Sequence, residues 1–97
     1  MEKHSYVYIL TDHCYGTLYV GVTSDLIKRI WQHRQACVDS FTQRYNLDRL
    51  IWYEVHEDIF EAITREKQIK KWKRAWKIRL IQQMNPLWRD LYSDIAT

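Results

Sequence analysis

The chain has 97 residues, of which 46% are hydrophobic and 14% aromatic, enough for one domain with a packed core and too apolar for a disordered chain. Two Cys residues without paired spacing argue against a disulfide framework and favour a reducing cytoplasm, and no apolar run approaches the roughly 20 residues of a membrane span. The net charge of +3 is mild but uneven, because Arg65–Arg79 holds eight Lys or Arg and one acid, as binding to an anionic polymer requires.

A β-hairpin is predicted at the start of the chain. Residues 5–12 (SYVYILTD) and 17–22 (TLYVGV) are rich in the aromatic and β-branched residues that favour strands. The HCYG segment between them is typical of a turn. Gly21 predicts that the second strand ends there because something, such as a phosphate, approaches the backbone closely.

The first helix is expected from Ser24 to Ala36, with Thr23 or Ser24 as its N-cap. Helical spacing gives it an apolar side that we expect to face the sheet. That side consists of Leu26, Ile27, Ile30 and Trp31. Residues 37–48 have no clean period and predict a loop.

The second half of the chain predicts a strand and two further helices. Residues 49–56 (RLIWYEVH) read as the strand, and Asp58 begins a helix in which Glu61 completes a capping box. That helix is expected to break near residues 71–74, and a third helix continues to about Met84. The buried stripe of the second helix is predicted to be Ile59, Ala62, Ile63 and Ile69. The order β-β-α-β-α-α predicts an α+β domain with a small, mostly antiparallel sheet.

Glu66 is the first candidate for chemistry. Its position on the apolar stripe of the second helix predicts that its carboxylate faces the sheet rather than solvent. A carboxylate that is desolvated without a partner is strongly destabilising. Glu66 therefore needs a cation, which Lys70, Arg29 or a bound metal can supply. Pairing with Lys70 is the simplest structural explanation.

Arg29 and His33 are the second candidate, because they lie one turn apart on the first helix. Alone, such a pair is more often a solvated face than a functional site. Tyr8 and Tyr19 in the hairpin could point to the same place if the helix packs across the sheet. The alternation of apolar residues does not settle which face of the sheet either tyrosine takes.

The basic stretch is the third candidate. Trp72 and Trp76 are expected to be core anchors within it. The surrounding cations exceed what solubility requires and predict contacts with nucleic-acid phosphates. The residues predicted to bind nucleic acid are Lys67, Lys70, Lys71, Lys73, Arg74 and Lys77. A zinc site is disfavoured, because the pairs at 13–14 and 33–37 lack a four-ligand motif.

The ordered set of motifs resembles the GIY-YIG nuclease superfamily, in particular its small stand-alone bacterial branch. The first family motif corresponds to residues 6–8 (YVY) and the second to 19–21 (YVG). The chain departs from the family in having Tyr6 at the first glycine, and Val at the centre of both motifs. The resemblance continues through REKQIKKWKRAWK and NPLWRDL, to about Leu91.

The resemblance implies a three-stranded antiparallel sheet flanked by helices, and hydrolysis of phosphodiester bonds in DNA with one Mg²⁺ or Mn²⁺ per active site. By family analogy the substrate is structured or damaged DNA, as in repair or recombination. The residues carried over as catalytic are Tyr8, Tyr19, Arg29, His33 and Glu66, with Gly21 and Asn85 as supporting residues.

Each carried-over residue has an expected role. Glu66 would hold the metal, Arg29 would brace the scissile phosphate, and Tyr8 or Tyr19 would act as base or relay for the attacking water. His33 would orient a tyrosine or a phosphate. A phenol titrates near pH ~10 in water, so a tyrosine base predicts a rate that rises into mildly alkaline pH.

Two other functions fit parts of the sequence. A non-catalytic nucleic-acid-binding protein would tolerate loss of Glu66, whereas a nuclease would not. A protein-interaction adaptor would use exposed Trp31, Trp52 and Trp88, and its binding need not weaken steeply with salt. Because the chain has no separate DNA-binding module, a protein partner could supply substrate specificity. The choice of DNA over RNA, the type of cut and the oligomeric state stay open.

Overall fold

The computed structural model describes residues 4–35 and 47–96. Its sheet is antiparallel with strand order β2-β1-β3, and the strands are β1 (Ser5–Thr11), β2 (Leu18–Thr23) and β3 (Arg49–His56). The helices of the described residues are α1 (Leu26–Arg34), α3 (Ile59–Lys71), α4 (Arg74–Met84) and α5 (Tyr92–Ile95). The predicted α+β class and element order are confirmed. Most of the predicted loop at 37–48 lies outside the described residues.

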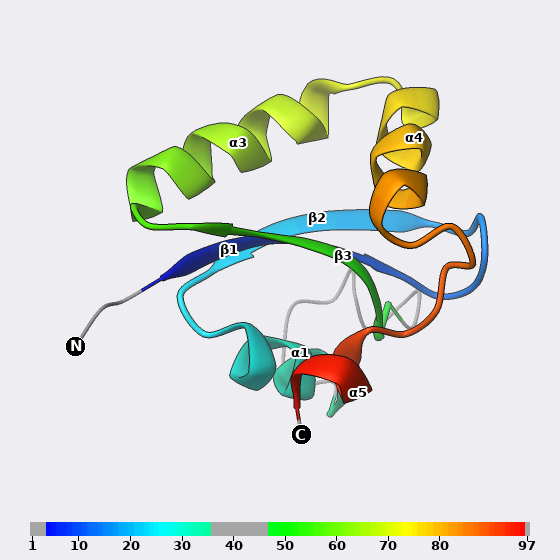
Figure 1. The fold of residues 1–97 in the computed structure, drawn as a ribbon, viewed down its shortest axis with the longest axis horizontal. Coiled ribbons are helices and arrows are strands. Elements are labelled where there is room, and N and C mark those ends of the chain that lie inside the picture. The colour runs from blue at the N-terminus through cyan, green and yellow to red at the C-terminus, as the bar shows by residue number, and fades with distance from the viewer. Residues whose placement is uncertain (1–3, 36–46, 97) are drawn as a thin grey trace.

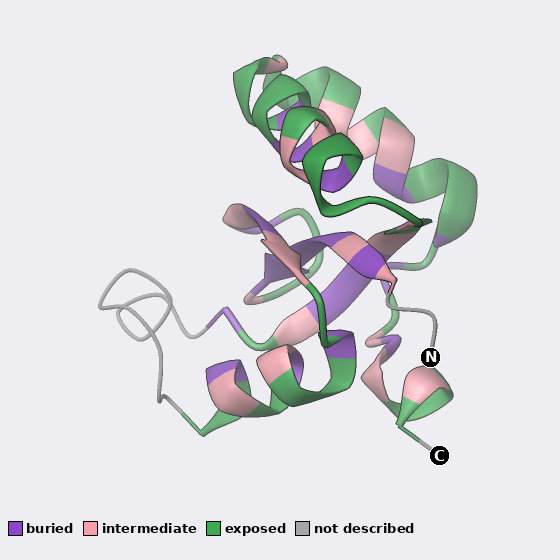
Figure 2. Ribbon diagram, turned by 90° about the vertical axis from the view of Figure 1, so that its left-hand side faces the viewer, coloured by how far each residue is buried: buried purple, intermediate pink, exposed green. Residues whose placement is uncertain are grey.

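The sheet separates two hydrophobic clusters. Helices α3 and α4 cover one face, and α1 and α5 lie against the other (Figure 1). Alternate residues of β1 divide accordingly, because successive side chains of a strand point to opposite faces. Val7 and Ile9 face α3, whereas Tyr8 and Leu10 face α1. The buried positions gather on the strands and on the inward sides of the helices (Figure 2).

Pairing of β1 with β2 places Tyr8 opposite Gly21. The turn between the two strands is held by Asp12, whose Oδ1 accepts hydrogen bonds from the backbone N–H groups of His13 at 3.0 Å and Thr17 at 3.1 Å. The second strand continues to Thr23. The prediction that this strand ends at Gly21 was therefore wrong.

The start of α1 differs from the prediction. Asp25 is the N-cap, and its Oδ1 accepts a hydrogen bond from the Lys28 N–H at 3.2 Å. Thr23 instead accepts from the Asp25 N–H at 3.1 Å, so it shapes the turn before the helix. The Asp carboxylate reaches the orphan N–H groups of the first turn, which is why it takes the capping position. The helix ends at Arg34 with Gln35 as its C-cap, so it is shorter than the predicted helix, which extended to residue 36.

The apolar side of α1 is narrower than predicted. Leu26 and Ile30 are buried, but Ile27 is 45% and Trp31 51% exposed. A helix nine residues long that packs on a sheet buries one stripe, and residues on the flank of that stripe stay in contact with water.

The break between α3 and α4 is confirmed, because Trp72 and Lys73 have extended backbones. Asp58 is the N-cap of α3, as predicted, and accepts a hydrogen bond from the Phe60 N–H at 2.8 Å. Ile59 is 38% exposed rather than buried, because it occupies the first turn. Trp76 was predicted to be a core anchor, but it is 51% exposed. Its ring packs edge-on against that of Trp72, with the ring centroids 6.2 Å apart. No helix within 4–35 or 47–96 has the length and apolar character to span a membrane.

Candidate active site

Tyr8 lies at the centre of the α1 face of the sheet. Its side chain has no exposed surface. A Cβ at Gly21 would lie 2.4 Å from Tyr8 Cζ and 2.5 Å from Tyr8 Oη. Only glycine therefore leaves room for the phenol across this strand pair. The close approach that Gly21 permits in the structure is that of a tyrosine, rather than the predicted phosphate.

Helix α1 brings two polar side chains to the Tyr8 hydroxyl. Arg29 Nε donates a hydrogen bond to Tyr8 Oη at 3.3 Å, and His33 Nε2 lies 3.2 Å from the same oxygen. His33 is buried, with 6% of its surface exposed. The spacing of four residues places both side chains on one side of the helix, which here is the side that meets Tyr8.

Tyr19 completes the group. Its ring centroid lies 6.4 Å from that of Tyr8 and 5.6 Å from that of His33, in an edge-on arrangement with the imidazole. Tyr19 is half-buried, unlike Tyr8. Tyr8, Tyr19, Arg29 and His33, all predicted as catalytic, thus lie together, and we call them the tyrosine–arginine cluster.

The cluster stabilises a permanent positive charge. The hydrogen bond to Tyr8 is the largest cause that raises the pKa of Arg29 above its ordinary value, and burial offsets part of the increase. Arg29 lines a cleft of about 680 Å³ that runs between the end of β2 and the first turns of α1 and α3, and we call it the arginine cleft. Its lining residues are Val22, Thr23, Ser24, Asp25, Lys28, Arg29, Gln32 and Ile59. A phosphate entering this cleft would meet two cations, Lys28 and Arg29.

Sequence reasoning missed Lys28 and Gln32 as lining residues of this cleft. Lys28 gave a usable signal, because it precedes Arg29 and a cation next to a phosphate-binding arginine adds to the attraction. Gln32 gave none, since an uncharged polar residue on a surface helix is ordinary.

Glu66 is buried, as predicted, and lies in α3 over the opposite face of the sheet from Tyr8. Lys70 Nζ lies 2.5 Å from Glu66 Oε1, which confirms the ion pair. Among the described residues, Lys70 is the one cation that pairs with this carboxylate. Because Glu66 and Arg29 lie on opposite faces of the sheet, any ligand that they share must pass around an edge of the sheet.

The donor set at Glu66 fits a hard divalent cation held by few protein ligands. The described residues contain no group of three or more His, Cys, Asp or Glu side chains placed to hold a metal. Mg²⁺ commonly uses one or two carboxylates together with water and substrate phosphate oxygens. A single buried carboxylate whose partner is one movable lysine fits that mode of binding and does not fit a four-ligand zinc site.

Asn85 has a structural position away from the tyrosine–arginine cluster. Its Nδ2 donates to the carbonyl oxygens of Ile51 at 3.1 Å and Arg89 at 2.8 Å, and its Oδ1 accepts from the Arg89 N–H at 3.0 Å. These bonds fasten the segment after α4 to β3. The predicted supporting role at the site is therefore indirect at most.

The predicted nucleic-acid-binding residues divide into two groups. Lys67, Lys70, Lys71 and Lys73 are exposed. Arg74 instead donates from Nη2 to the carbonyl oxygens of Tyr15 at 2.6 Å and Gly16 at 2.7 Å, so it holds the β1–β2 turn. Lys77 is half-buried, and its burial and the neighbouring Arg74 charge lower its pKa. Arg74 is better explained by structure than by phosphate binding.

Comparison with known proteins identifies the family to which this arrangement belongs. The model of the GIY-YIG catalytic domain matches residues 4–79, which include the whole tyrosine–arginine cluster and Glu66. The chain belongs to the GIY-YIG family. This GIY-YIG protein is 34% identical to a UPF0213 protein of Staphylococcus saprophyticus over 83 residues, covering 86% of this chain and 99% of the relative. A UPF0213 protein of Clostridium perfringens is 40% identical over 78 residues, covering 79% of this chain and 82% of the relative.

The fold of this GIY-YIG protein is also similar to a solved structure. The solution NMR structure of a UPF0213 protein from Bacillus halodurans aligns with a TM-score of 0.57 at 26% identity. The alignment covers 97% of this chain and 98% of that chain. The family is a nuclease family, and the resemblance inferred from the motifs is confirmed.

Proposed function

We propose that this GIY-YIG protein is a divalent-metal-dependent endonuclease that hydrolyses phosphodiester bonds in structured or damaged DNA, in repair or recombination. The observation that carries the proposal is the convergence of Arg29 and His33 on the hydroxyl of Tyr8, with Arg29 also lining a cleft beside a second cation, Lys28. The buried part of the cluster thus fixes an arginine that a phosphate in the cleft can reach.

Arg29 is the group that holds the scissile phosphate. Its Nε donates to Tyr8 and its side chain also bonds Tyr19, which together fix the plane of the guanidinium. The remaining N–H groups can form bonds with phosphate oxygens. Because its charge is permanent, it also stabilises the additional negative charge of the transition state.

The two tyrosines have different roles. Tyr8 has no exposed surface, so it positions Arg29 and His33 rather than meeting a water molecule. Tyr19 is half-buried in the same cluster, so it is the one of the two phenols that can reach water. As phenolate, Tyr19 would take a proton from the attacking water.

Glu66 would hold Mg²⁺ or Mn²⁺, and the cation would neutralise charge on the phosphoryl oxygens when bound. Lys70 occupies the cation position beside this carboxylate in the structure, so it must move away when the metal binds. The exposed Lys67, Lys71 and Lys73 would contact phosphates along the DNA.

The test is cleavage of supercoiled and branched DNA with Mg²⁺ or Mn²⁺ by wild type, Glu66→Ala and Arg29→Ala. Matched controls are Glu61→Ala and Arg89→Ala, which remove an exposed carboxylate from the same helix and an exposed arginine from elsewhere. We expect cleavage by wild type and both controls and none by the two site variants, which still bind DNA.

Two results would contradict the proposal. Equal cleavage by all five proteins would mean a contaminating nuclease. Salt-sensitive binding without cleavage by any of them would favour the alternative, a non-catalytic nucleic-acid-binding protein that keeps the fold. The adaptor alternative has less support, because Trp52 and Trp88 are buried and only Trp31 of its three tryptophans is exposed.

A further inference from the structure

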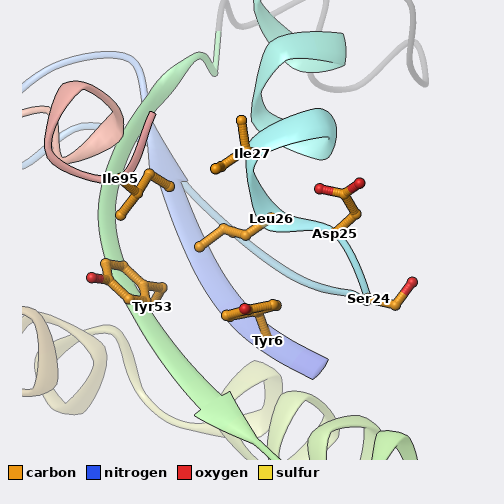
Figure 3. Close-up of a pocket in the computed structure, with 7 residues that line it drawn as sticks. All are labelled: Tyr6, Ser24, Asp25, Leu26, Ile27, Tyr53 and Ile95. Carbon is orange, nitrogen blue, oxygen red and sulfur yellow. The ribbon is translucent and has the colours of Figure 1, made fainter. Parts of the chain in front are cut away.

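A second cavity adjoins the arginine cleft and has no role in the chemistry described above. It measures about 370 Å³, which lies in the range of roughly 300–1,000 Å³ that small-ligand sites occupy. We call it the tyrosine pocket. Its lining residues are Tyr6, Ser24, Asp25, Leu26, Ile27, Tyr53 and Ile95 (Figure 3).

The pleat of the sheet places the two rings of this pocket. Tyr53 pairs with Tyr8 and Tyr6 pairs with Val55, so Tyr6 and Tyr53 are diagonal neighbours on one face. Both rings are half-buried against the α1 side of the sheet. Leu26 extends toward them from the start of α1, and Ile95 approaches from α5 (Figure 3). The result is an aromatic and aliphatic slot that is partly open to water.

The tyrosine pocket adjoins the arginine cleft, because Ser24 and Asp25 line both. Their charges differ sharply. Of the described residues that line the pocket none is Lys or Arg, whereas the cleft presents Lys28 and Arg29. The Asp25 carboxylate, at the boundary, points away from the two rings (Figure 3). A phosphate is therefore attracted to the cleft, and an uncharged aromatic group is suited to the pocket.

We propose that the tyrosine pocket binds one unpaired nucleobase of the DNA whose neighbouring phosphate lies at Arg29. This inference rests on the proposed nuclease function and narrows its substrate to DNA with an unpaired nucleotide beside the cleavage site. Bases stack on aromatic side chains whatever their sequence, and one nucleotide joins a base to a charged phosphate, as the pocket joins the cleft. A fully paired base cannot enter, because both its faces are already stacked in the duplex.

The experiment compares DNA binding in EDTA, where the proposed cleavage cannot occur, by fluorescence anisotropy. Three labelled duplexes of one sequence are used: fully paired, with a single bulged thymidine, and with an abasic nucleotide at the bulge. The proteins are wild type, Tyr6→Leu, Tyr53→Leu, Tyr6→Phe and the control Tyr15→Leu, whose tyrosine is 50% exposed outside the pocket. Circular dichroism verifies that each variant is folded.

We expect wild type to bind the thymidine bulge about tenfold more tightly than the abasic bulge, the size of one stacking interaction. Both Leu variants should lose this preference, while Tyr6→Phe and Tyr15→Leu keep it. Quenching of 2-aminopurine at the bulge gives a direct signal of stacking that does not depend on a variant's stability. The proposal fails if wild type binds the two bulges equally, or if both Leu variants retain the preference.

Cleavage of the same duplexes with Mg²⁺ separates this inference from the proposed function. Cleavage of all three duplexes without any base preference would contradict the nucleobase pocket and support the proposed nuclease function. A base preference in binding without cleavage of any duplex would support the nucleobase pocket and contradict the proposed nuclease function.

Discussion

The phenol ring of Tyr8 lies directly over Gly21 on the neighbouring strand, where a Cβ would come within 2.4 Å of Tyr8 Cζ. This contact links a backbone requirement to the candidate chemistry. The ring can reach Arg29 and His33 only because residue 21 has no side chain. Gly21 of the second motif is therefore required for Tyr8 of the first motif to pack in this position.

We predict that Gly21→Ala displaces Tyr8 and abolishes activity. The overpacked strand pair should lose about 1–3 kcal/mol of unfolding free energy, because neither the ring nor the strand can yield without strain. Thermal denaturation and the cleavage assay measure the two effects. In a Tyr8→Leu background, Gly21→Ala should cost much less stability than it does in wild type, since the shorter side chain leaves the methyl group room, and activity should stay absent. An equal cost of Gly21→Ala in both backgrounds would contradict the contact.

The roles of the tyrosines predict different responses to pH. Tyr19→Phe should reduce the rate by about 10²–10⁴-fold and remove its rise between neutral and pH ~9.5. Tyr8→Phe should instead lower stability by about 1–3 kcal/mol, because Arg29 Nε and His33 Nε2 lose their shared partner. Single-turnover rates across this pH range measure the first effect. A flat wild-type profile with chemistry rate-limiting would exclude a tyrosine base.

Arg29 does not contribute to that pH profile. Its pKa is raised in the folded protein above its ordinary value, chiefly by the hydrogen bond to Tyr8. A group whose pKa is raised by folding contributes stability at every pH below its unfolded value and loses it only as pH rises through the folded value. Arg29 therefore stays charged, and its contribution to stability stays constant, throughout the range in which the rate is measured.

The contact between Lys70 and Glu66 predicts competition with the metal. Lys70→Met should bind Mn²⁺ more tightly than wild type, by about five- to tenfold, because the carboxylate no longer has to give up an ammonium partner. Glu66→Gln should bind none. Calorimetric titration in the absence of DNA measures both, independently of cleavage. Weaker Mn²⁺ binding by Lys70→Met would mean that Lys70 supports the site rather than occupies it.

Arg74 and Lys71 carry the same charge, but we expect their substitutions to affect different properties, stability for Arg74 and DNA binding for Lys71. Arg74→Ala should lower unfolding free energy by about 1 kcal/mol, or the melting temperature by roughly 4–8 °C, because the carbonyls of Tyr15 and Gly16 lose their donor. Lys71→Ala should leave stability unchanged and reduce the slope of log K against log salt by about 0.9. Melting curves and salt titrations of DNA binding measure the pair. Equal melting temperatures would contradict the structural role of Arg74.

Local sequence patterns were sufficient to predict the helices and strands of this chain. The strand predicted at 5–12, observed at 5–11, the Asp58 cap and the break at 72–73 are confirmed, because strand propensity, capping and helix termination depend on neighbouring residues. The inward position of Glu66 and its pairing with Lys70 also followed from helical spacing alone. The motif residues identified the family for the same reason, since their order and spacing are properties of the sequence.

The sequence by itself thus determined the fold class, the family and the membership of the tyrosine–arginine cluster. Only the tertiary structure determined which side chains contact one another and which are buried. Period-2 alternation does not say which face of the sheet receives a helix, so the burial of Tyr8 and the partial exposure of Tyr19 were not predictable. The exposure of Trp76 depends on how helix α4 packs on the sheet, which helical spacing does not give. The contact of Tyr8 with Gly21 depends on strand register, and the joining of the tyrosine pocket to the arginine cleft depends on where α1 begins. These are relations between segments distant in sequence, and packing alone sets them.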